Sequence, residues 1–334
     1  MTKCLIIGSG IVGLITAYEL RKSGCNVTVV DNNKAGQASS NAAGILFPLS
    51  PWKNQKNMQE LCIEGHKAYC SFFNNFTKKE KEEFNYERKR ILLFGNNLDL
   101  ARRWYKDKEI LKSSYVNKKI NSVENNIKEL HKNYIEIPDI NIISPINFLS
   151  FLKNILLKNK VNFIKDEIEN IDAYLKRNEN REYDYFIVSA GAWSNKILGK
   201  KNVNIKPIKG QLLHIKVKKK LINNILIYND YYIFQRENKE IIVGSTIEDV
   251  GFDEGVTKSA KNYLEESLSE LFLEKLEINN LKQTYGFRPY SEKDKPHVCI
   301  DSNNNKIIYN FGHYRYGILA AIPSAKMVKE FIIY

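Results

Sequence analysis

The sequence of 334 residues has few cysteines and no long apolar run. Its five cysteines are scattered, with no CxxC pair, so we expect neither a disulfide framework nor a zinc site. No uninterrupted apolar stretch reaches the roughly 18 residues that a membrane-spanning helix requires. The first expected strand begins at Lys3, before a signal peptide could fit. We therefore expect a cytoplasmic protein without a transmembrane segment.

Several sets of catalytic residues are missing as well. No Ser–His–Asp set, cluster of metal ligands or phosphate-transfer lysine is evident, so no metal site is expected. Internal repeats and low-complexity linkers are also missing. Hydrophobic residues nevertheless make up 43% of the chain, which is ordinary for a globular protein. A chain of this length should form one large domain or two intimate ones.

The formal net charge of +13 would suit nucleic acid, an anionic membrane or an anionic substrate. The longest basic run, residues 216–220, is flanked by ordinary sequence and has no interleaved aromatic residues. Nucleic-acid-binding proteins usually cluster their charge on one face. We interpret the excess as lysines spread over the surface that keep the protein soluble, and we expect no nucleic-acid partner.

The N-terminal segments have the pattern of a βαβ unit. The apolar run from Cys4 to Ile7 predicts a buried parallel strand. Apolar residues recur at helical spacing from Ile11 to Ser23, and Gly24 ends that helix. Residues 26–30 predict a second buried strand, which Asp31 closes.

The rest of the chain mixes parallel and antiparallel patterns. Further helices are expected at 57–84, 101–111, 146–157, 259–273 and 317–333, and further strands at 90–94, 185–188, 211–217, 231–236, 240–244 and 306–310. Parallel-sheet signals lie at both ends and at 160–195, and alternating half-buried runs lie between 206 and 246. The expected fold class is α/β, with a Rossmann-like domain interleaved with an α+β domain built on a mainly antiparallel sheet.

The segment from Gly8 to Gly13 is a GxGxxG motif between the first strand and the first helix. Its first glycine allows the turn, the second lets backbone N–H groups approach a pyrophosphate, and the third lets helix and strand pack closely. Asp31 follows 18 residues after Gly13. An acid at that place accepts hydrogen bonds from a ribose 2′-hydroxyl and repels a 2′-phosphate. These features together predict an adenine dinucleotide.

Residues 37–45 are small and polar where an ordinary Rossmann dehydrogenase would begin its next helix. Small residues permit close approach to an extended cofactor, and the hydroxyls of Ser39 and Ser40 can bond phosphate or ribitol oxygens. The same composition also suits a surface loop. This segment alone does not decide between FAD and NAD.

Several segments resemble the D-amino-acid oxidase superfamily of FAD enzymes, and within it the glycine oxidase branch. Besides the N-terminal fingerprint they are 38–46, 188–194, 207–211, 243–246, 286–289 and 312–319, in the family's order. The resemblance implies FAD, and we expect it to be non-covalent because no Cys or His occupies an obvious attachment position. It also predicts an FAD-binding domain from 1–50, 140–205 and 296–334, and a substrate-binding domain from 51–139 and 206–295.

The resemblance further implies a site for a substrate carboxylate above the flavin ring. Arg288 and Arg315 would face it, since a guanidinium offers two parallel N–H donors and constant charge. Tyr232 matches a position whose hydroxyl reaches the carboxylate, although an aromatic residue on a strand also suits core packing. His313 is expected to be structural. The residues that would contact the cofactor are Gly8, Gly10, Ile11, Val12, Gly13, Asp31, Asn32, Ala38, Ser39, Ser40, Ala43, Gly44, Ile45, Ile168, Ala190, Gly191, Trp193, Gly312, His313, Tyr314, Arg315, Tyr316, Gly317 and Ile318.

The implied reaction is oxidation of glycine or another small amino acid, with hydride passing from Cα to the flavin. The imino acid would hydrolyse to a keto acid and ammonia, and O2 or another acceptor would reoxidise the flavin. A role in thiamine thiazole synthesis follows from the family alone. Tyr316 stands where glycine oxidases commonly have a smaller amide, and Pro289-Tyr290 replaces Pro-Gly, so substrate size stays open.

The sequence is also compatible with two alternative functions. One is a D-amino-acid oxidase or dehydrogenase for small D-residues, and the other is a flavin oxidase that modifies a tRNA wobble uridine. The segment 312–317 differs from the motif of the tRNA-modifying enzymes. A homo-oligomer is compatible with the sequence but is not predicted by it.

Overall fold

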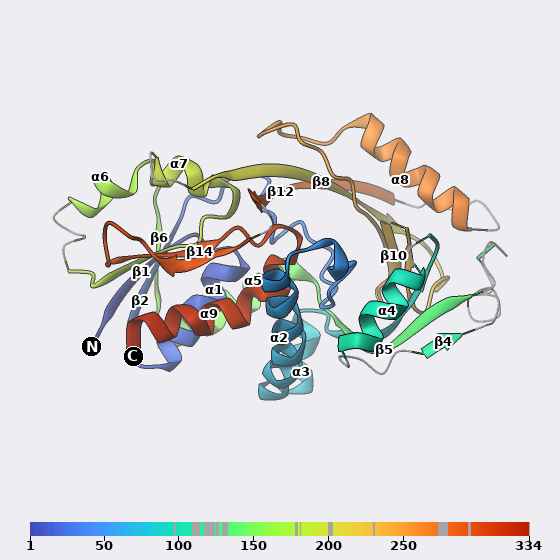
Figure 1. Ribbon diagram of the computed structural model, residues 1–334, viewed down its shortest axis with the longest axis horizontal. Coiled ribbons are helices and arrows are strands. Elements are labelled where there is room, and N and C mark those ends of the chain that lie inside the picture. Colours follow the sequence, from blue (N-terminus) through green and yellow to red (C-terminus); the bar gives the residue numbers. More distant parts are fainter. Residues whose placement is uncertain are drawn as a thin grey trace.

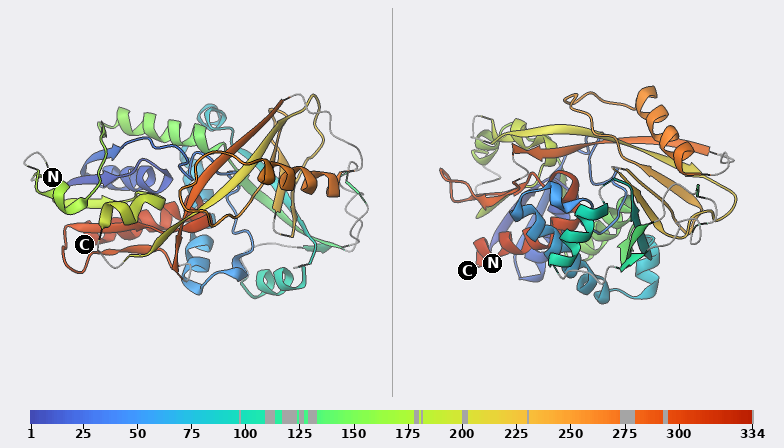
Figure 2. Two further views of the ribbon diagram at one scale, coloured as in Figure 1. Left: turned by 90° about the horizontal axis from the view of Figure 1, so that it is seen from above. Right: turned by 45° about the vertical axis from the view of Figure 1, so that its right-hand side comes forward.

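The computed structural model describes residues 1–96, 98–108, 114–116, 124, 127–128, 133–177, 180, 182–199, 203–229, 231–272, 280–292 and 295–333. Two sheets organise these residues, and helices cover their faces (Figures 1 and 2). Both termini lie at the same end of the molecule (Figure 1). In the part of the chain described, no helix is long and apolar enough to cross a membrane.

The smaller sheet has a parallel core. In spatial order its strands are β13 (His297–Ile300), β14 (Ile307–Phe311), β7 (Tyr185–Val188), β1 (Lys3–Ile7), β2 (Asn26–Asp31) and β6 (Asn162–Lys165). All neighbouring pairs are parallel except β13–β14. Strands from the beginning, middle and end of the chain therefore build one sheet, and its order places β1 at the centre.

Side chains alternate along β1 and bury both faces of this sheet. Cys4 and Ile6 belong to a core with helices on one face, and Leu5 and Ile7 belong to the core on the other face. The helices of the first core are α1 (Ile11–Lys22), α2 (Lys56–Phe72), α5 (Pro145–Lys158) and α9 (Gly317–Ile333), and those of the second are α6 (Ile171–Leu175) and α7 (Ser194–Leu198). The expected βαβ unit is confirmed.

The larger sheet is mainly antiparallel. In spatial order its strands are β12 (Asn280–Ser291), β8 (Ile205–Lys216), β11 (Glu240–Gly244), β10 (Tyr231–Gln235), β9 (Ile225–Tyr228), β3 (Glu87–Phe94), β5 (Tyr134–Ile142) and β4 (Ser114–Val116). Among these pairs β3–β9 is parallel. The long β8 and β12 pair over their full length, from Asn280 opposite Lys216 to Ser291 opposite Ile205.

Alternation along β10 decides which residues of the larger sheet face inward. Tyr231 and Ile233 pack in a core with α8 (Lys258–Leu271), which covers the outer face (Figure 1). Tyr232 and Phe234 lie on the opposite face, in a core that includes α4 (Leu98–Lys108). Because of this alternation the hydroxyl of Tyr232 points toward the middle of the molecule.

The single helix predicted at 57–84 is wrong. The structure has α2, then the 3-10 turn η2 (Phe73–Asn75), then the short α3 (Lys78–Glu83). Thr77 starts α3 with a capping box, in which its hydroxyl accepts from Glu80 N and Glu80 accepts from Thr77 N. The apolar periodicity had predicted one continuous helix, whereas the Thr-x-x-Glu capping signal in this charged run starts a second helix. Residues 109–111 and 273 of two other predicted helices lie outside the described residues.

Candidate active site

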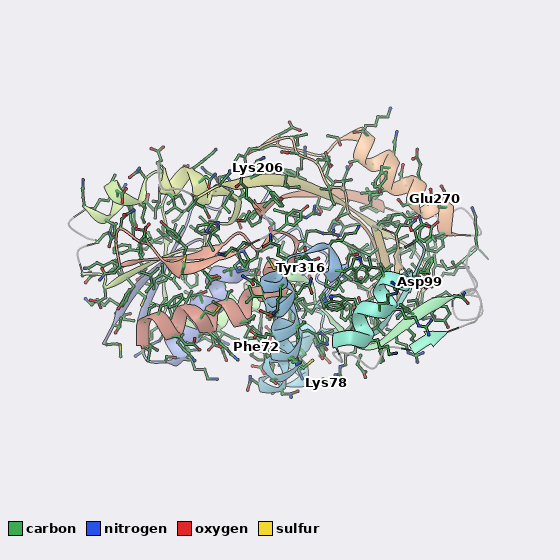
Figure 3. The ribbon with its side chains drawn as sticks, viewed as in Figure 1. Phe72, Lys78, Asp99, Lys206, Glu270 and Tyr316 are labelled. Carbon is green, nitrogen blue, oxygen red and sulfur yellow. The ribbon has the colours of Figure 1, made fainter. Side chains whose placement is uncertain are left out.

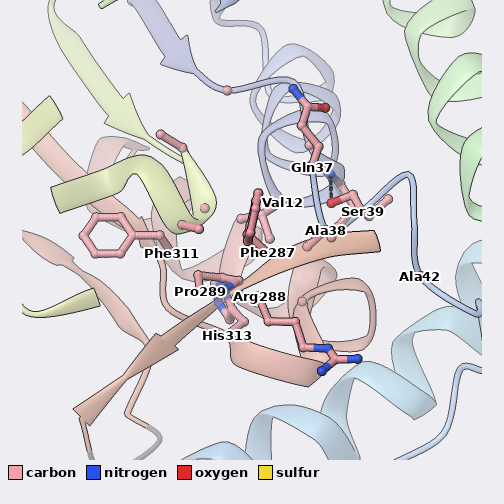
Figure 4. Close-up of a pocket in the computed structure, with 18 of the residues that line it drawn as sticks. Val12, Gln37, Ala38, Ser39, Ala42, Phe287, Arg288, Pro289, Phe311 and His313 are labelled. Atoms are coloured by element: carbon pink, nitrogen blue, oxygen red, sulfur yellow. Dashed lines mark hydrogen bonds between the residues drawn. The ribbon is translucent and has the colours of Figure 1, made fainter. Parts of the chain in front are cut away.

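A cavity of about 540 Å³ is lined by residues of both sheets (Figure 4). It extends from the carboxyl ends of β1 and β2 to β8, β10 and β12. The carboxyl ends of parallel strands are where α/β folds bind dinucleotides. The cavity thus joins a dinucleotide-binding edge to the inner face of the larger sheet.

The glycine motif forms the turn from β1 into α1. Gly8 has a φ of +109°, and a Cβ on Gly13 would lie 1.9 Å from the Gly8 carbonyl oxygen. Only glycine lets the helix approach the strand this closely. Gly10 is the N-cap residue of α1 and has no side chain to cap it, but Ser39 Oγ accepts a hydrogen bond of 3.0 Å from Ile11 N. The positive end of α1 faces the cavity, which suits a pyrophosphate.

Asp31 ends β2 beside this helix terminus. Its Oδ2 accepts a hydrogen bond of 2.6 Å from Ser9 N, and its Oδ1 accepts from Asn33 N at 2.6 Å and from Gln37 Nε2 at 3.1 Å. Asp31 and Asn32 both line the cavity. A carboxylate oxygen can accept two hydrogen bonds, so Oδ2 still has capacity for a ribose hydroxyl while the side chain orders the surrounding turns.

Residues 37–45 form a wall of the cavity rather than an exposed loop. Gly44 has a φ of +84°, and a Cβ there would lie 2.1 Å from the carbonyl oxygen of Ile143. The segment therefore fits between the two sheets only with small side chains. Ser40 does not line the cavity, and its hydroxyl donates to Gln37 O at 3.1 Å.

Arg288, Arg315 and Tyr232 meet at the other end of the cavity, although they come from β12, the 3-10 turn η7 (Tyr314–Tyr316) and β10. The Arg288 side chain lies across Gly210 of the paired strand β8, where a Cβ would come within 2.1 Å of Nη2. Arg288 Nη1 donates to Thr246 O at 2.9 Å. Gly210 thus provides the space in which this guanidinium lies.

The charges at this end are unbalanced. Burial lowers the pKa of Arg288, and the charge of Arg315 lowers that pKa further. Burial raises the pKa of the Tyr232 phenol, whereas the two guanidinium groups lower it. Among the described residues, no carboxylate lies within ion-pair distance of either guanidinium. Two cations beside a protonated phenol make a site for a small anion.

Three buried polar atoms on the cavity wall also lack a hydrogen-bond partner among the described residues. They are Ser189 Oγ, Asn310 Oδ1 and His313 Nε2. Buried polar atoms are rarely left unpaired in proteins. Burial lowers the pKa of His313 to about 4, so its ring is neutral at pH 7. These atoms, together with the glycine turn and Asp31, fit a cofactor such as FAD that carries polar groups along its length.

Most residues predicted to contact cofactor or substrate line this cavity. They are Gly8, Gly10, Ile11, Val12, Asp31, Asn32, Ala38, Ser39, Ala43, Gly44, Ile45, Ile168, Ala190, Gly191, Trp193, Tyr232, Arg288, His313, Tyr314, Arg315, Tyr316, Gly317 and Ile318. Gly13, Ser40 and Gly312 do not line it. Gly13 packs on Gly8, the Ser40 hydroxyl donates to Gln37 O, and Gly312 (φ +84°) lies against three neighbouring side chains.

Several lining residues were not predicted from the sequence, among them Gln37, Phe47, Leu49, Gly210, Ser245, Phe287 and Asn310. Gln37 and Gly210 lay inside segments already singled out, where a Gln and a Gly are residue types that signal polar contact and close approach. Phe47 and Leu49 carried no signal that distinguishes them from ordinary core residues.

Comparisons with known proteins agree with this geometry. The family described as FAD dependent oxidoreductase (DAO) matches residues 3–331. A glycine oxidase from Pseudomonas aeruginosa is 24% identical, over 98% of this chain and 94% of that protein. The fold is similar to the crystal structures of a glycine oxidase from Bacillus cereus and an iminodiacetate oxidase from Chelativorans sp., each with a TM-score of 0.83, 20% identity and coverage of 99% of this chain and 95% of the other.

Proposed function

The chain belongs to the DAO family of FAD-dependent oxidoreductases, and from that premise we propose that it oxidises the amine carbon of glycine or another small amino acid. The observation that carries the proposal is the convergence of Arg288, Arg315 and Tyr232 with no carboxylate of the described residues within ion-pair distance of either guanidinium, although Glu248 is close enough to act on the pKa of Arg288. A guanidinium can bind a carboxylate through two parallel N–H···O bonds. Similarity to a glycine oxidase supports the same substrate class.

We propose that the chain binds FAD non-covalently along the N-terminus of α1, Asp31 and the wall formed by residues 37–45. When bound, FAD supplies the electron acceptor for the amine carbon. The parts of the chain around it would be an FAD-binding domain of 1–50, 140–205 and 296–334 and a substrate-binding domain of 51–139 and 206–295. The cavity lies where these ranges meet.

In the proposed mechanism, the protein's own residues orient the substrate and exclude water. Arg288 and Arg315 hold the carboxylate, and Tyr232 donates its hydroxyl hydrogen to the same group. Because burial raises the pKa of Tyr232, the phenol keeps that hydrogen at neutral pH. Fixing the carboxylate orients the Cα–H bond, which is worth several kcal/mol of barrier. The substrate amine must be neutral, and the imine formed hydrolyses to a keto acid and ammonia.

The wall beside Arg315 favours a small substrate. Tyr316 is buried in the middle of the molecule, and its hydroxyl donates to Leu49 O at 2.6 Å and accepts from Asn54 Nδ2 at 2.8 Å (Figure 3). The Tyr316 hydroxyl therefore both donates and accepts a hydrogen bond, and these two bonds fix the position of the side chain. With Leu49 and Phe47 also on the wall, we propose that side chains larger than that of alanine are excluded.

The test is anaerobic reduction of the purified flavoprotein, followed by its visible spectrum. Glycine, sarcosine or D-alanine should bleach the flavin, and the larger D-valine and D-phenylalanine should not. R288M is the matched control, because Arg288 is expected to contact the substrate and not the cofactor, so the variant should keep the bound flavin and lose the bleaching. If none of the amino acids bleached the wild-type flavin, the proposed function would be wrong. Oxygen consumption with the bleaching substrate then separates an oxidase from a dehydrogenase that uses another acceptor.

A further inference from the structure

Arg236 is a buried cation that the family match and the proposed mechanism leave without a role. It follows β10 directly, and only 4% of its surface is exposed. Its Nη2 donates to the carbonyl oxygens of Ala43 and Ile143, both at 2.8 Å. The guanidinium lies 5.3 Å from the ring centroid of Phe234. Arg236 Nε also lies 3.9 Å from Glu240 Oε2. Burying a charge is costly unless it is paired and hydrogen-bonded, so these contacts together offset a desolvation penalty.

The two carbonyl groups belong to segments that are far apart in sequence. Ala43 lies in the cavity wall, and Ile143 lies between β5 and α5. The segments also bond each other directly, through Ile143 N to Gly44 O at 3.0 Å and Leu46 N to Asn141 O at 3.0 Å. Arg236 adds a third segment, from the larger sheet, to this junction. Its charge is thus placed immediately behind the wall that lines the cofactor cavity.

The orientation of the Ala43–Gly44 peptide follows from this contact. In a trans peptide the carbonyl and the N–H point in opposite directions. Arg236 holds the Ala43 carbonyl on the side away from the cavity, so the N–H of Gly44 points toward the side that Ala43, Gly44 and Ile45 line. No group among the described residues accepts from that N–H. A charged donor on the carbonyl also polarises the peptide and strengthens its N–H as a donor.

We propose that Arg236 is a positioning residue of the cofactor site, which fixes the Ala43–Gly44 peptide so that its N–H is available to an acceptor atom of bound FAD. Arg236 itself does not touch the cavity. Its effect passes through one peptide unit next to Gly44, whose φ of +84° shows a backbone position where glycine has more conformational freedom than other residues. This role concerns cofactor binding and is independent of which substrate is oxidised.

The experiment compares FAD binding by R236M, R236K and the matched control K89M. Lys89 is a buried cation of the same charge cluster, paired with Glu87 at 3.2 Å and Glu237 at 3.3 Å, and Glu87 also acts on the pKa of Arg236. Lys89 neither lines the cavity nor bonds Ala43 or Ile143, so K89M changes the cluster without changing the Ala43 contact. Titration of FAD fluorescence with each apoprotein gives the dissociation constant, and thermal unfolding of the apoproteins reports stability. R236M should bind FAD at least tenfold more weakly and shift the absorption bands of the bound flavin, while K89M should lose stability and keep FAD affinity within twofold.

R236K should lie between wild type and R236M, because an ammonium group reaches fewer acceptors than a guanidinium. FAD affinity and flavin spectrum unchanged in R236M would overturn the proposal. An equal loss of FAD affinity in R236M and K89M would also overturn the proposal, because removing either buried cation of the larger sheet would then weaken FAD binding to the same extent. If R236M does not fold, R236K decides, and unchanged affinity in that variant overturns the proposal. No amino-acid substrate enters the measurement, so its outcome is separate from that of the proposed function.

Discussion

Replacing Gly210 by alanine should displace the Arg288 guanidinium without preventing the protein from folding. The added Cβ would lie 2.1 Å from Nη2, 2.2 Å from Cζ and 2.4 Å from Nη1, whereas ordinary contact begins at about 3.4 Å. The guanidinium must therefore withdraw by about 1 Å. The clashing atoms are the end of a flexible side chain, and Gly210 has no positive φ that alanine would have to adopt. The sheet can accept the substitution, but Arg288 cannot stay in place.

The expected cost follows from the hydrogen bonds that Arg288 would lose. A hydrogen bond between charged groups contributes roughly 1.5–3 kcal/mol, and a displacement of about 1 Å can lower a rate by about 100-fold. The kcat/KM of G210A for the substrate that bleaches the flavin should thus fall about 10- to 100-fold. Steady-state oxygen consumption with saturating FAD measures it, or anaerobic flavin reduction if oxygen is not the acceptor. FAD affinity should remain within a few-fold.

A double-mutant cycle separates this explanation from a general distortion of β8 and β12. If alanine at position 210 acts by moving Arg288, then G210A should cost almost nothing in the R288A background. Dissociation constants of a small carboxylate such as glycolate, measured from the flavin spectrum, keep the cycle usable when turnover is too slow. An equal cost of G210A in both backgrounds would refute the reasoning, as would an unchanged kcat/KM in the single variant.

Three other substitutions have defined outcomes. D31A removes the acceptor of two backbone N–H groups beside the helix terminus and should weaken FAD binding about tenfold or more in a fluorescence titration; unchanged affinity would contradict the role of Asp31. The pKa of His313 is lowered to about 4, so the unfolded chain takes up a proton first, and stability falls as the pH drops below about 6.5. From pH 7 to 5 the FAD-free protein should lose about 2 kcal/mol more than H313Q in urea unfolding, and parallel losses would contradict this. G65A would place a Cβ 1.9 Å from the backbone oxygen of Leu319, so α2 and α9 must separate, and unfolding should become easier by about 1–3 kcal/mol; wild-type stability would refute the close packing.

Part of the fold could be predicted from patterns among residues that are close together in the sequence. The βαβ unit, the turn at Gly8 and the strand β10 follow from local periodicity and glycine placement, and they are confirmed. The strands β5, β9 and β12 were not predicted. In β12, exposed and partly buried residues occupy most positions, because much of the strand borders the cavity or solvent rather than a core. The sequence of β12 therefore lacks the apolar alternation from which a half-buried strand is predicted.

The site was predicted less by local pattern than by resemblance. Arg288 and Arg315 look like ordinary surface arginines until the chain is folded, and only the family's motif order suggested that they converge. Gly210 and Arg236 show the limit of both approaches. Their roles depend on the register that sets Gly210 opposite Gly286 and on the packing of residues 43 and 143 against the end of β10. Such long-range registers are fixed by tertiary contacts, which a single sequence does not reveal.

The order of strands in the smaller sheet has a consequence for synthesis on the ribosome. β14 lies between β13 and β7, and α9 packs on α1, so the last part of the chain completes a sheet that the first part begins. Until residues beyond Phe311 emerge, β7 keeps an unpaired, apolar edge, which is a template for wrong pairing. A stalled or prematurely terminated chain would expose that edge along with one side of α1. The native pairing of the smaller sheet can therefore be completed only after β14 has been translated.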